Sequence, residues 1–235
     1  MVETKLSKYL IAYNNSKEYH QVKSEVFTNK IYHLDYLSKI SKPVIIDIGA
    51  HIGIASLYFN MQNGDSIIYA YEPNPTAFIL LEHNININSL QSQVFISPNA
   101  ISANNGLIDL YIDKNIEDQN WTSVSSIITD GWQSKIEMES IKVNAITLDK
   151  AIENCYKSPD IIKIDVEGAE YKIIEKSKLI NQATYLIIEL HPIAKRSRQE
   201  SIKKIRRILS KKGFIIEEVR LDDEELSVII AKIIS

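Results

Sequence analysis

The chain has 235 residues, 45% of them hydrophobic and 24% charged, and a formal net charge of −3. A chain of this length forms one large domain or two small ones, and its charge gives no general attraction to nucleic acid or acidic membranes. Cys155 is the single cysteine, which excludes an internal disulfide and fits a reducing compartment. No apolar run is long enough to span a bilayer, and residues 1–10 lack the apolar core of a signal peptide, so we expect a cytoplasmic protein.

Residues 1–42 have apolar positions at mixed helical spacing, among them Tyr9, Leu10 and Tyr13. This pattern predicts short helices and one irregular strand. The segment either covers the sheet or caps the substrate crevice, and covering is the favoured interpretation. We therefore expect an N-terminal cap or extension over residues 1–42 and a main domain over residues 43–235.

The stretch from Val44 to Gly53, V-I-I-D-I-G-A-H-I-G, is the centre of the predicted fold. Its Ile and Val residues predict a buried parallel strand that ends in a glycine turn and leads into a helix. Such a turn directs backbone N–H groups into the crevice at the carboxyl edge of the sheet. The spacing D-x-G-x-x-x-G puts an acid before the first glycine, which suits a positively charged ligand without phosphate, such as S-adenosylmethionine. An ordinary strand–turn–helix is the alternative.

Strands and helices alternate through the rest of the chain. Further strands are predicted at residues 66–71, 93–97, 106–112, 139–146, 160–166, 183–190, 214–219 and 226–234. Helices are predicted at residues 75–89, from residue 148, where Thr147 can cap, and at 195–212. The alternation predicts an α/β fold with a doubly wound, mostly parallel sheet, and the short turn before the last strand predicts an antiparallel strand there. The polar stretch 113–137, with Trp121 and Trp132, is predicted to be a long loop that acts as a lid; its tryptophans alternatively anchor it to the core.

Six motifs occur in a fixed order along the chain. They are V-I-I-D-I-G-A-H-I-G, Y-E-P-N-P with a helix ending in H-N-I-N-I-N, N-A-I-S, I-T-L-D, I-I-K-I-D-V-E-G-A-E and I-I-E-L-H-P. This series resembles the FkbM-type family of S-adenosylmethionine-dependent methyltransferases over residues 43–192. The resemblance implies the Rossmann-like class I methyltransferase fold, a seven-stranded sheet with the last strand antiparallel, and O-methylation of a sugar, glycan or small metabolite.

The first loop and the ends of the next two strands are the expected cofactor site. We expect the methionyl end to be bounded by Asp47, Gly49, Ala50, His51 and Gly53. The Asp47 carboxylate acts there through a water or by ordering the loop; the family commonly has Asn at His51, so this residue is expected to tune the pocket. Glu72 can accept both ribose hydroxyls, as an acid does in dinucleotide folds. Asn99 and Ala100 can read the adenine edge, although Asn is also an ordinary turn residue.

Acidic residues and a histidine surround the ends of two later strands. Methyl transfer to an alcohol requires positioning and a base or a metal. Asp165 and Glu167 are the first candidates for this work, and Glu189 and His191 are the second pair. The alternatives are a tight turn at Glu167, a helix-dipole partner at Glu170 and a strand-end histidine. No ligand spacing is diagnostic, so a divalent cation is compatible with these residues but no metal is predicted.

Other functions remain open at this point. Residues 195–212 hold nine basic residues and one acid; we favour a solvated helix face, with an anionic partner as the alternative. An N-methyltransferase or nucleic-acid methyltransferase is the alternative enzyme, but the Asn/Asp-Pro-Pro-aromatic signature is absent and D-V-E-G stands in its place. A cofactor-binding partner subunit without catalysis is the alternative outside the enzymes. The sequence predicts no oligomeric state.

Overall fold

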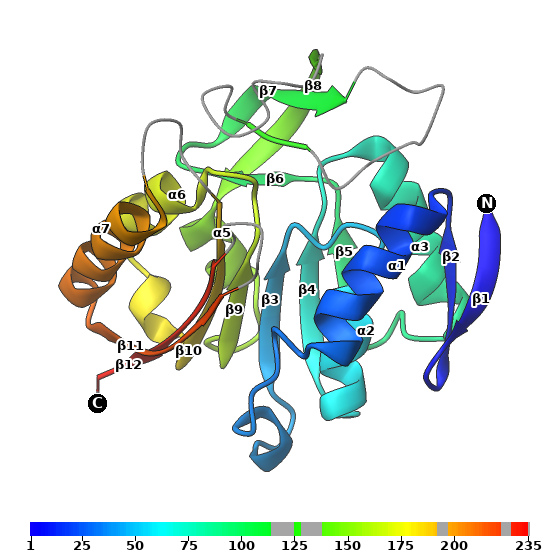
Figure 1. Cartoon of the computed structure of the whole chain (residues 1–235), viewed down its shortest axis with the longest axis horizontal. Coiled ribbons are helices and arrows are strands. Elements are labelled where there is room, and N and C mark those ends of the chain that lie inside the picture. The colour runs from blue at the N-terminus through cyan, green and yellow to red at the C-terminus, as the bar shows by residue number, and fades with distance from the viewer. Residues whose placement is uncertain (114–124, 128–137, 192–196, 222–226, 235) are drawn as a thin grey trace.

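A seven-stranded sheet forms the centre of the computed structural model, which describes residues 1–113, 125–127, 138–191, 197–221 and 227–234 (Figure 1). The strand order is β11-β12-β10-β9-β3-β4-β5. The bounds are β3 (Val44–Ile48), β4 (Ile67–Tyr71), β5 (Val94–Ser97), β9 (Ile161–Ile164), β10 (Tyr185–Leu190), β11 (Phe214–Leu221) and β12 (Ser227–Ile233). β12 runs antiparallel to both β10 and β11, and the pairs among β5, β4, β3, β9 and β10 are parallel. The predicted sheet and its antiparallel last strand are therefore confirmed.

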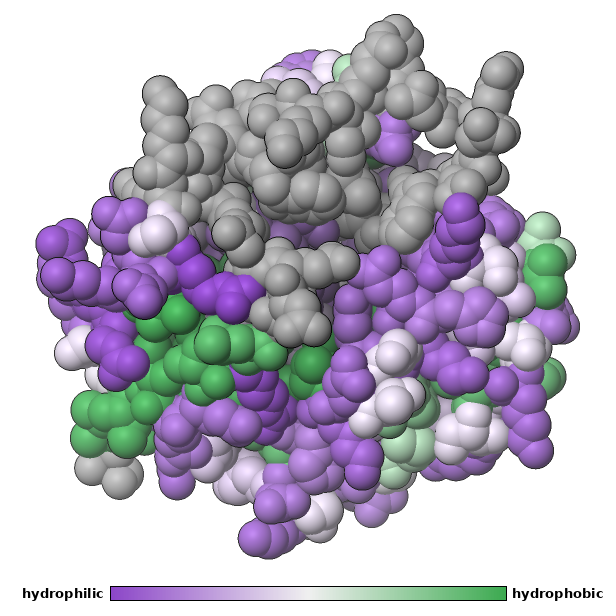
Figure 2. All heavy atoms as spheres, in the orientation of Figure 1, coloured by the Kyte–Doolittle hydropathy of each residue, from purple (hydrophilic) through white to green (hydrophobic). Residues whose placement is uncertain are grey.

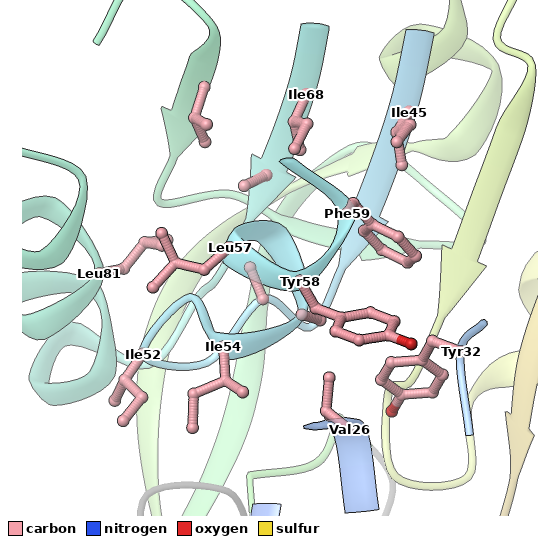
Figure 3. Close-up of a cluster of buried hydrophobic side chains, with 14 of the residues drawn as sticks. Val26, Tyr32, Ile45, Ile52, Ile54, Leu57, Tyr58, Phe59, Ile68 and Leu81 are labelled. Carbon is pink, nitrogen blue, oxygen red and sulfur yellow. The ribbon is translucent and has the colours of Figure 1, made fainter. Parts of the chain in front are cut away.

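Helices cover both faces of this sheet. The cluster on one face joins Ile45 and Ile187 to α2 (Ile54–Gln62) and α3 (Pro75–Ile87). Figure 3 shows Ile45 and Ile68 of the sheet beside Phe59 and Leu57 of α2. The cluster on the other face includes residues of α5 (Leu148–Glu153), α6 (Glu170–Lys176) and α7 (Arg198–Lys211). Because successive residues of a strand point to opposite faces, Ile-rich strands such as β3 fill both cores at once.

Residues 1–42 form a small unit against the first face. A hairpin of β1 (Val2–Leu6) and β2 (Tyr9–Tyr13) precedes α1 (Ser16–Lys23), the π-helix η1 (Ser24–Thr28) and the 3-10 helix η2 (Leu37–Lys39). The Asn84 side chain of α3 accepts from the backbone N–H of Ala12 at 2.6 Å and donates to the Ala12 carbonyl at 3.0 Å. The segment therefore packs against α3, and it begins with a hairpin that the apolar spacing did not reveal.

A second, three-stranded sheet lies beyond the carboxyl ends of β3 and β4 (Figure 1). It consists of β6 (Ala100–Ser102), β7 (Gly106–Asp113) and β8 (Met138–Thr147), in the order β6-β8-β7. The predicted half-exposed strands correspond to β7 and β8, which pair antiparallel, and Thr147 caps α5 as predicted. β6 was not predicted, because three residues are too short to show a period.

The basic helix α7 has one apolar side. Ile205, Ile208 and Leu209 are buried, whereas hydrophilic residues gather over this helix in Figure 2. The helix begins at Arg198, later than predicted, because Ser197 and Glu200 form a reciprocal capping box. These contacts agree with the favoured interpretation of a solvated helix face. Within the described ranges, no helix has the length and apolar character of a membrane span.

Candidate active site

The predicted site residues lie at the carboxyl ends of neighbouring parallel strands. Asp47 belongs to β3, Glu72 follows β4, Asp165 follows β9 and His191 follows β10. β4, β3, β9 and β10 are consecutive neighbours in the sheet, so these strand ends face one crevice. Trp121 and Trp132 lie outside the described residues. The described part of the long loop, residues 125–127, contacts two of the strand-end loops: Ser125 accepts from Asn74 at 2.8 Å, and Ser126 donates to the Glu167 carbonyl at 2.9 Å.

The loop after β3 depends on glycine. Gly49 has φ +73°, and a Cβ there would stand 1.8 Å from the Asp165 carbonyl oxygen. Only glycine allows the first loop to pass so close to the end of β9. Gly53 has φ +93° and is the N-cap of α2. Gly49 therefore lets the loop lie against the strand end that carries Asp165, and Gly53 lets the chain turn into α2.

Asp47 supports this loop from inside. Its side chain is completely buried, accepts a hydrogen bond from Ser56 Oγ at 2.6 Å and lies 3.3 Å from Lys163 Nζ. These contacts link β3 to α2 and β9, and the two modes expected for Asp47 at the cofactor stay predictions. Ala50, 2% exposed, is also buried beside it.

His51 is held between the first loop and the N-terminal segment. Its Nε2 atom lies 3.4 Å from a carboxylate oxygen of Glu18, which belongs to α1. Burial by itself would lower the pKa of His51, but Glu18 outweighs it and raises that pKa above its usual value. Glu18 had no signal in the sequence, because its partner is 33 positions away and only the fold brings them together.

Glu72 is a buried carboxylate with a fixed orientation. Its two oxygens accept backbone N–H groups, one from His51 and one from Asn74, each at 2.8 Å. Burial raises the pKa of Glu72 above its usual value, while His51 and these N–H groups act in the opposite direction. Each carboxylate oxygen has a second lone pair, so the group can still accept hydroxyl donors. The predicted role at the ribose is compatible with this geometry.

Lys163 was missed by the sequence reasoning. It lies in the middle of β9, is 2% exposed, and is 3.3 Å from Asp47 and 3.1 Å from Asp165. Its Nζ also donates to the Gly49 carbonyl at 2.7 Å. Burial would lower the pKa of Lys163, but Asp165 and Asp47 reverse the effect and raise it. One signal could have indicated this residue: it is a single charge inside the apolar run I-I-K-I. A lysine in a buried strand is almost always paired with an acid, so this position predicts a buried ion pair.

Asp165, Glu167 and His191, the predicted catalytic residues, lie close together. His191 Nε2 is 3.3 Å from a Glu167 oxygen and 3.8 Å from an Asp165 oxygen, and its Nδ1 is 2.9 Å from Glu170 Oε1. Burial would lower the pKa of His191, but the carboxylates of Glu167 and Glu170 hold it well above its usual value. Glu170 is the first residue of α6, as the helix-dipole alternative required, and it also orients the histidine.

Glu189 accepts a hydrogen bond from a tyrosine of the N-terminal segment. The Tyr32 hydroxyl donates to Glu189 and lies 3.5 Å from an Asp165 oxygen. Burial and the nearby Asp165 raise the pKa of Glu189 to about 8. Figure 3 shows Tyr32 next to Val26 and Tyr58, so the ring is part of the core while its hydroxyl reaches the site. No pattern in the sequence distinguishes Tyr32 as a site residue.

We expect Tyr32→Phe to lower the free energy of unfolding by about 1–3 kcal/mol, because the buried Glu189 carboxyl loses its donor. Urea unfolding followed by circular dichroism measures this difference. Tyr156→Phe removes an exposed hydroxyl that donates to the Lys42 carbonyl, and a change within about 0.5 kcal/mol is expected there. Equal unfolding curves for wild type and Tyr32→Phe would contradict the proposed importance of this contact.

Asn99 and Ala100 lie after β5. Asn99 Nδ2 donates to the Ser97 hydroxyl at 2.9 Å, and Ala100, 2% exposed, begins β6. This is the local contact of a turn residue, as the alternative interpretation expected. The Glu72 N–H donates to the Ser97 carbonyl, so the two strand ends are joined, and the adenine role of Asn99 and Ala100 stays a prediction.

The crevice has the chemistry that S-adenosylmethionine requires. That molecule carries an ammonium and a sulfonium, and the crevice is rich in buried or half-buried carboxylates. Glu72 has its two oxygens fixed by backbone N–H groups, and Asp165 and Glu167 stand at the neighbouring strand end. Opposite charge and fixed acceptors together make these residues fit the cofactor.

Comparison with known proteins gives agreeing matches. Residues 47–216 match the model of the methyltransferase FkbM domain. Methyltransferase sdnD of Sordaria araneosa is 26% identical over 172 residues, which cover 64% of this chain and 66% of that protein. The fibrillarin pre-rRNA processing protein of Methanococcus jannaschii has a TM-score of 0.53 at 15% identity, covering 98% of this chain and 81% of its own. The O-methyltransferase NcsB1, solved with S-adenosylmethionine and 2-hydroxy-5-methyl naphthoic acid, has a TM-score of 0.53 at 7% identity. The match covers 93% of this chain and 57% of the NcsB1 chain.

These matches differ in what they establish. The solved structures, at 7% and 15% identity, show that the fold is shared with an O-methyltransferase solved with S-adenosylmethionine and with a pre-rRNA processing protein. The family model is more specific, because residues 47–216 are more than half of the chain and include every strand end of the crevice. The chain therefore belongs to the methyltransferase FkbM domain family, as its six motifs predicted.

Proposed function

We propose that this methyltransferase uses S-adenosylmethionine to methylate a hydroxyl group of a sugar, glycan or other small metabolite. One observation carries the proposal: the same edge of the sheet holds a buried, oriented Glu72 after β4 and, beyond β3, a polar cluster of Asp165, Glu167 and His191 after β9 and β10. Glu72 fits the nucleoside of the cofactor, and the polar cluster fits the acceptor hydroxyl and the transferred methyl group. When bound, the cofactor supplies a methyl group activated by its sulfonium.

The proposed cofactor residues are those of the first loop and of the next two strand ends. Asp47, with Gly49, Ala50, His51 and Gly53, shapes the methionyl end. Glu72 accepts the ribose hydroxyls, and Asn99 with Ala100 borders the adenine. Asp47 and Ala50 are buried, so their proposed contribution is the shape of the loop.

Asp165 is the proposed proton acceptor for the hydroxyl. Its side chain is 23% exposed, compared with 14% for Glu167 and 3% for His191. The most accessible carboxylate of the cluster is the one that an incoming hydroxyl can reach, and general-base catalysis requires hydrogen-bond contact. Glu167 is the second candidate, and His191 is proposed to position both carboxylates.

Residues 1–42 are proposed to complete the acceptor side of the crevice. They supply Tyr32 to Glu189 and Glu18 to His51. Both contacts reach residues of the proposed site, so a cap is a better description of this segment than a simple cover. Residues 43–235 then form the main methyltransferase domain.

We expect Glu72→Ala to weaken S-adenosylmethionine binding by about 10- to 100-fold, because hydrogen bonds to a charged group contribute about 1.5–3 kcal/mol. Isothermal titration calorimetry gives the dissociation constants. Glu82→Ala, which removes an exposed glutamate from α3, is the matched control and should bind as wild type does. Unchanged affinity in a folded Glu72→Ala variant would remove this residue from the site.

The acceptor class is tested with a cofactor that carries a radiolabelled methyl group. Panels of sugars, nucleotide-sugars and small alcohols are compared with the corresponding amines and with RNA. Label in an alcohol that is lost in its deoxy analogue supports the proposal. Label in amines or RNA would favour the alternative methyltransferases, and cofactor binding without turnover on any panel would favour a partner subunit.

A further inference from the structure

We propose that Asp165, Glu167 and His191 form a binding site for a divalent metal ion. One ligand atom from each residue lies within 4.8 Å of the others. Asp165 directly follows β9, and His191 directly follows β10, its parallel neighbour in the sheet. Strand pairing thus brings His191 of the motif I-I-E-L-H-P to Asp165 and Glu167, which both belong to the motif I-I-K-I-D-V-E-G.

The spacing of the ligand atoms suits a bound ion. His191 Nε2 is 3.3 Å from the nearer Glu167 oxygen and 3.8 Å from the nearer Asp165 oxygen. Ligands about 2.1 Å from an octahedral ion stand about 3.0 Å apart when adjacent and about 4.2 Å apart when opposite. Both measured distances fall inside this range. An ion could therefore enter with small side-chain movements.

The orientation of His191 is an independent indication of an ion. Glu170 is completely buried, and its Oε1 lies 2.9 Å from His191 Nδ1 and accepts from the Gly168 N–H at 2.9 Å. The Glu170 carboxylate keeps a proton on Nδ1, so the proton on Nε2, which points toward Glu167 and Asp165, is the one that an incoming ion would displace. Histidines that bind metals are oriented in this way by a carboxylate on the other ring nitrogen.

The local charge also favours a cation. Lys163 supplies one positive charge next to this cluster. Among the residues that the structure describes, five carboxyl side chains lie around Lys163 and His191, namely Asp47, Asp165, Glu167, Glu170 and Glu189. Buried charges are stable only when they are paired or coordinated, and a dication would offset two of these carboxylates.

The ion would face the acceptor side of the crevice. His191, 3% exposed, would bind the ion on its buried side. Asp165 and Glu167, 23% and 14% exposed, would bind it on the side nearer to solvent. Coordination positions that the described side chains leave open would be available to water or to the acceptor hydroxyl. If the proposed function is right, on which this role rests, the ion lowers the pKa of that hydroxyl and directs its oxygen toward the methyl group.

Mn²⁺ is the probe for this site. Two carboxylate oxygens favour Mg²⁺, Ca²⁺ or Mn²⁺, whereas an imidazole nitrogen favours later first-row metals, and Mn²⁺ accepts this mixed set. It is also paramagnetic, so free and bound ions are distinguished by electron paramagnetic resonance. The full-length protein is titrated with MnCl₂ without cofactor or acceptor, so that ion binding is measured independently of methyl transfer.

We expect one saturable Mn²⁺ site in the wild-type protein. Glu167→Gln and His191→Gln should weaken it at least about tenfold, and Glu170→Gln, which disturbs the orientation of His191 without removing a ligand, about 10- to 100-fold. Glu175→Gln, an exposed position on the same helix as Glu170, is the matched control and should bind as wild type does. Nitrogen modulation in the electron spin echo of bound Mn²⁺ should be present in wild type and lost in His191→Gln.

Two results would overturn the site: no Mn²⁺ binding, or binding that is equal in wild type, Glu167→Gln and His191→Gln. Circular dichroism and cofactor calorimetry on the same samples exclude loss of folding as the reason for weak binding. Failure of the metal site and failure of the proposed function are distinguishable. Methyl transfer that persists undiminished in EDTA contradicts the ion and leaves the function, whereas Mn²⁺ binding without methyl transfer to any hydroxyl supports the ion and contradicts the function.

Discussion

Asp165→Asn is expected to slow methyl transfer by about 10²- to 10³-fold while the affinity for S-adenosylmethionine stays within about twofold of wild type. The amide has nearly the same shape as the carboxylate but cannot accept the hydroxyl proton. Asp165 is also the most exposed carboxyl of the cluster, with 23% of its side chain accessible compared with 14% for Glu167, so it is the one that an incoming hydroxyl reaches most easily. Lys163 keeps Asp47 as an ionic partner 3.3 Å away, so the fold should persist.

The measurement is a single-turnover assay with radiolabelled cofactor and the acceptor identified by the panel, run at saturating Mn²⁺ so that ion occupancy does not limit the rate. Calorimetry on the same preparation gives the cofactor affinity. Asp35→Asn is the matched control, because the Asp35 side chain is 87% exposed and should leave both quantities unchanged. A wild-type rate in Asp165→Asn would show that this residue has no role in the chemical step.

Lys163→Met is expected to lower the free energy of unfolding by about 3–5 kcal/mol, because removing one partner of a buried ion pair leaves its charge uncompensated. Lys163 is 2% exposed and Asp47 is completely buried, so water cannot replace the lost ammonium at Asp47. Methionine fills much of the same space, so the effect reports charge and hydrogen bonding more than a cavity. The Gly49 carbonyl also loses its donor, so the first loop should loosen.

Urea unfolding curves give this difference, with Lys150→Met as the control. Lys150 pairs with Glu153 at 3.3 Å on the surface, where such pairs contribute about 0–1 kcal/mol. A double variant with Asp47→Asn removes one of the stranded charges and should recover part of the loss, which a double-mutant cycle measures. A loss below about 1 kcal/mol in Lys163→Met would show that the buried pair is not needed for stability.

Much of the site followed from one rule of topology applied to the sequence. Glu72, Asp165 and His191 each follow a strand with an apolar, Ile-rich run, and parallel strands end at the same edge of a sheet. Knowing the strands was therefore enough to predict that these side chains share one crevice. It was not enough to predict which atoms touch, because two residues at one edge can still be separated by several ångströms.

The missed features depend on partners that are distant along the chain. Tyr32 and Glu189 are 157 positions apart, and no local period marks either of them as a pair. β6 has three residues and owes its existence to the parallel contact with β8. The hairpin of β1 and β2 shows a similar limit, since its first strand is mostly exposed and lacks the apolar alternation of a half-buried strand.

By itself, the sequence determined the α/β class, the antiparallel last strand and the methyltransferase family, because these depend on hydrophobic period, turn length and ordered motifs. Only the tertiary structure decided that Lys163 neutralises Asp47, that Glu170 orients His191, and that the N-terminal segment reaches the crevice. The physical reason is that burial and charge pairing are properties of neighbours in space. A carboxylate has the same sequence signal whether it is solvated or enclosed, and its chemistry is fixed only when the chain folds around it.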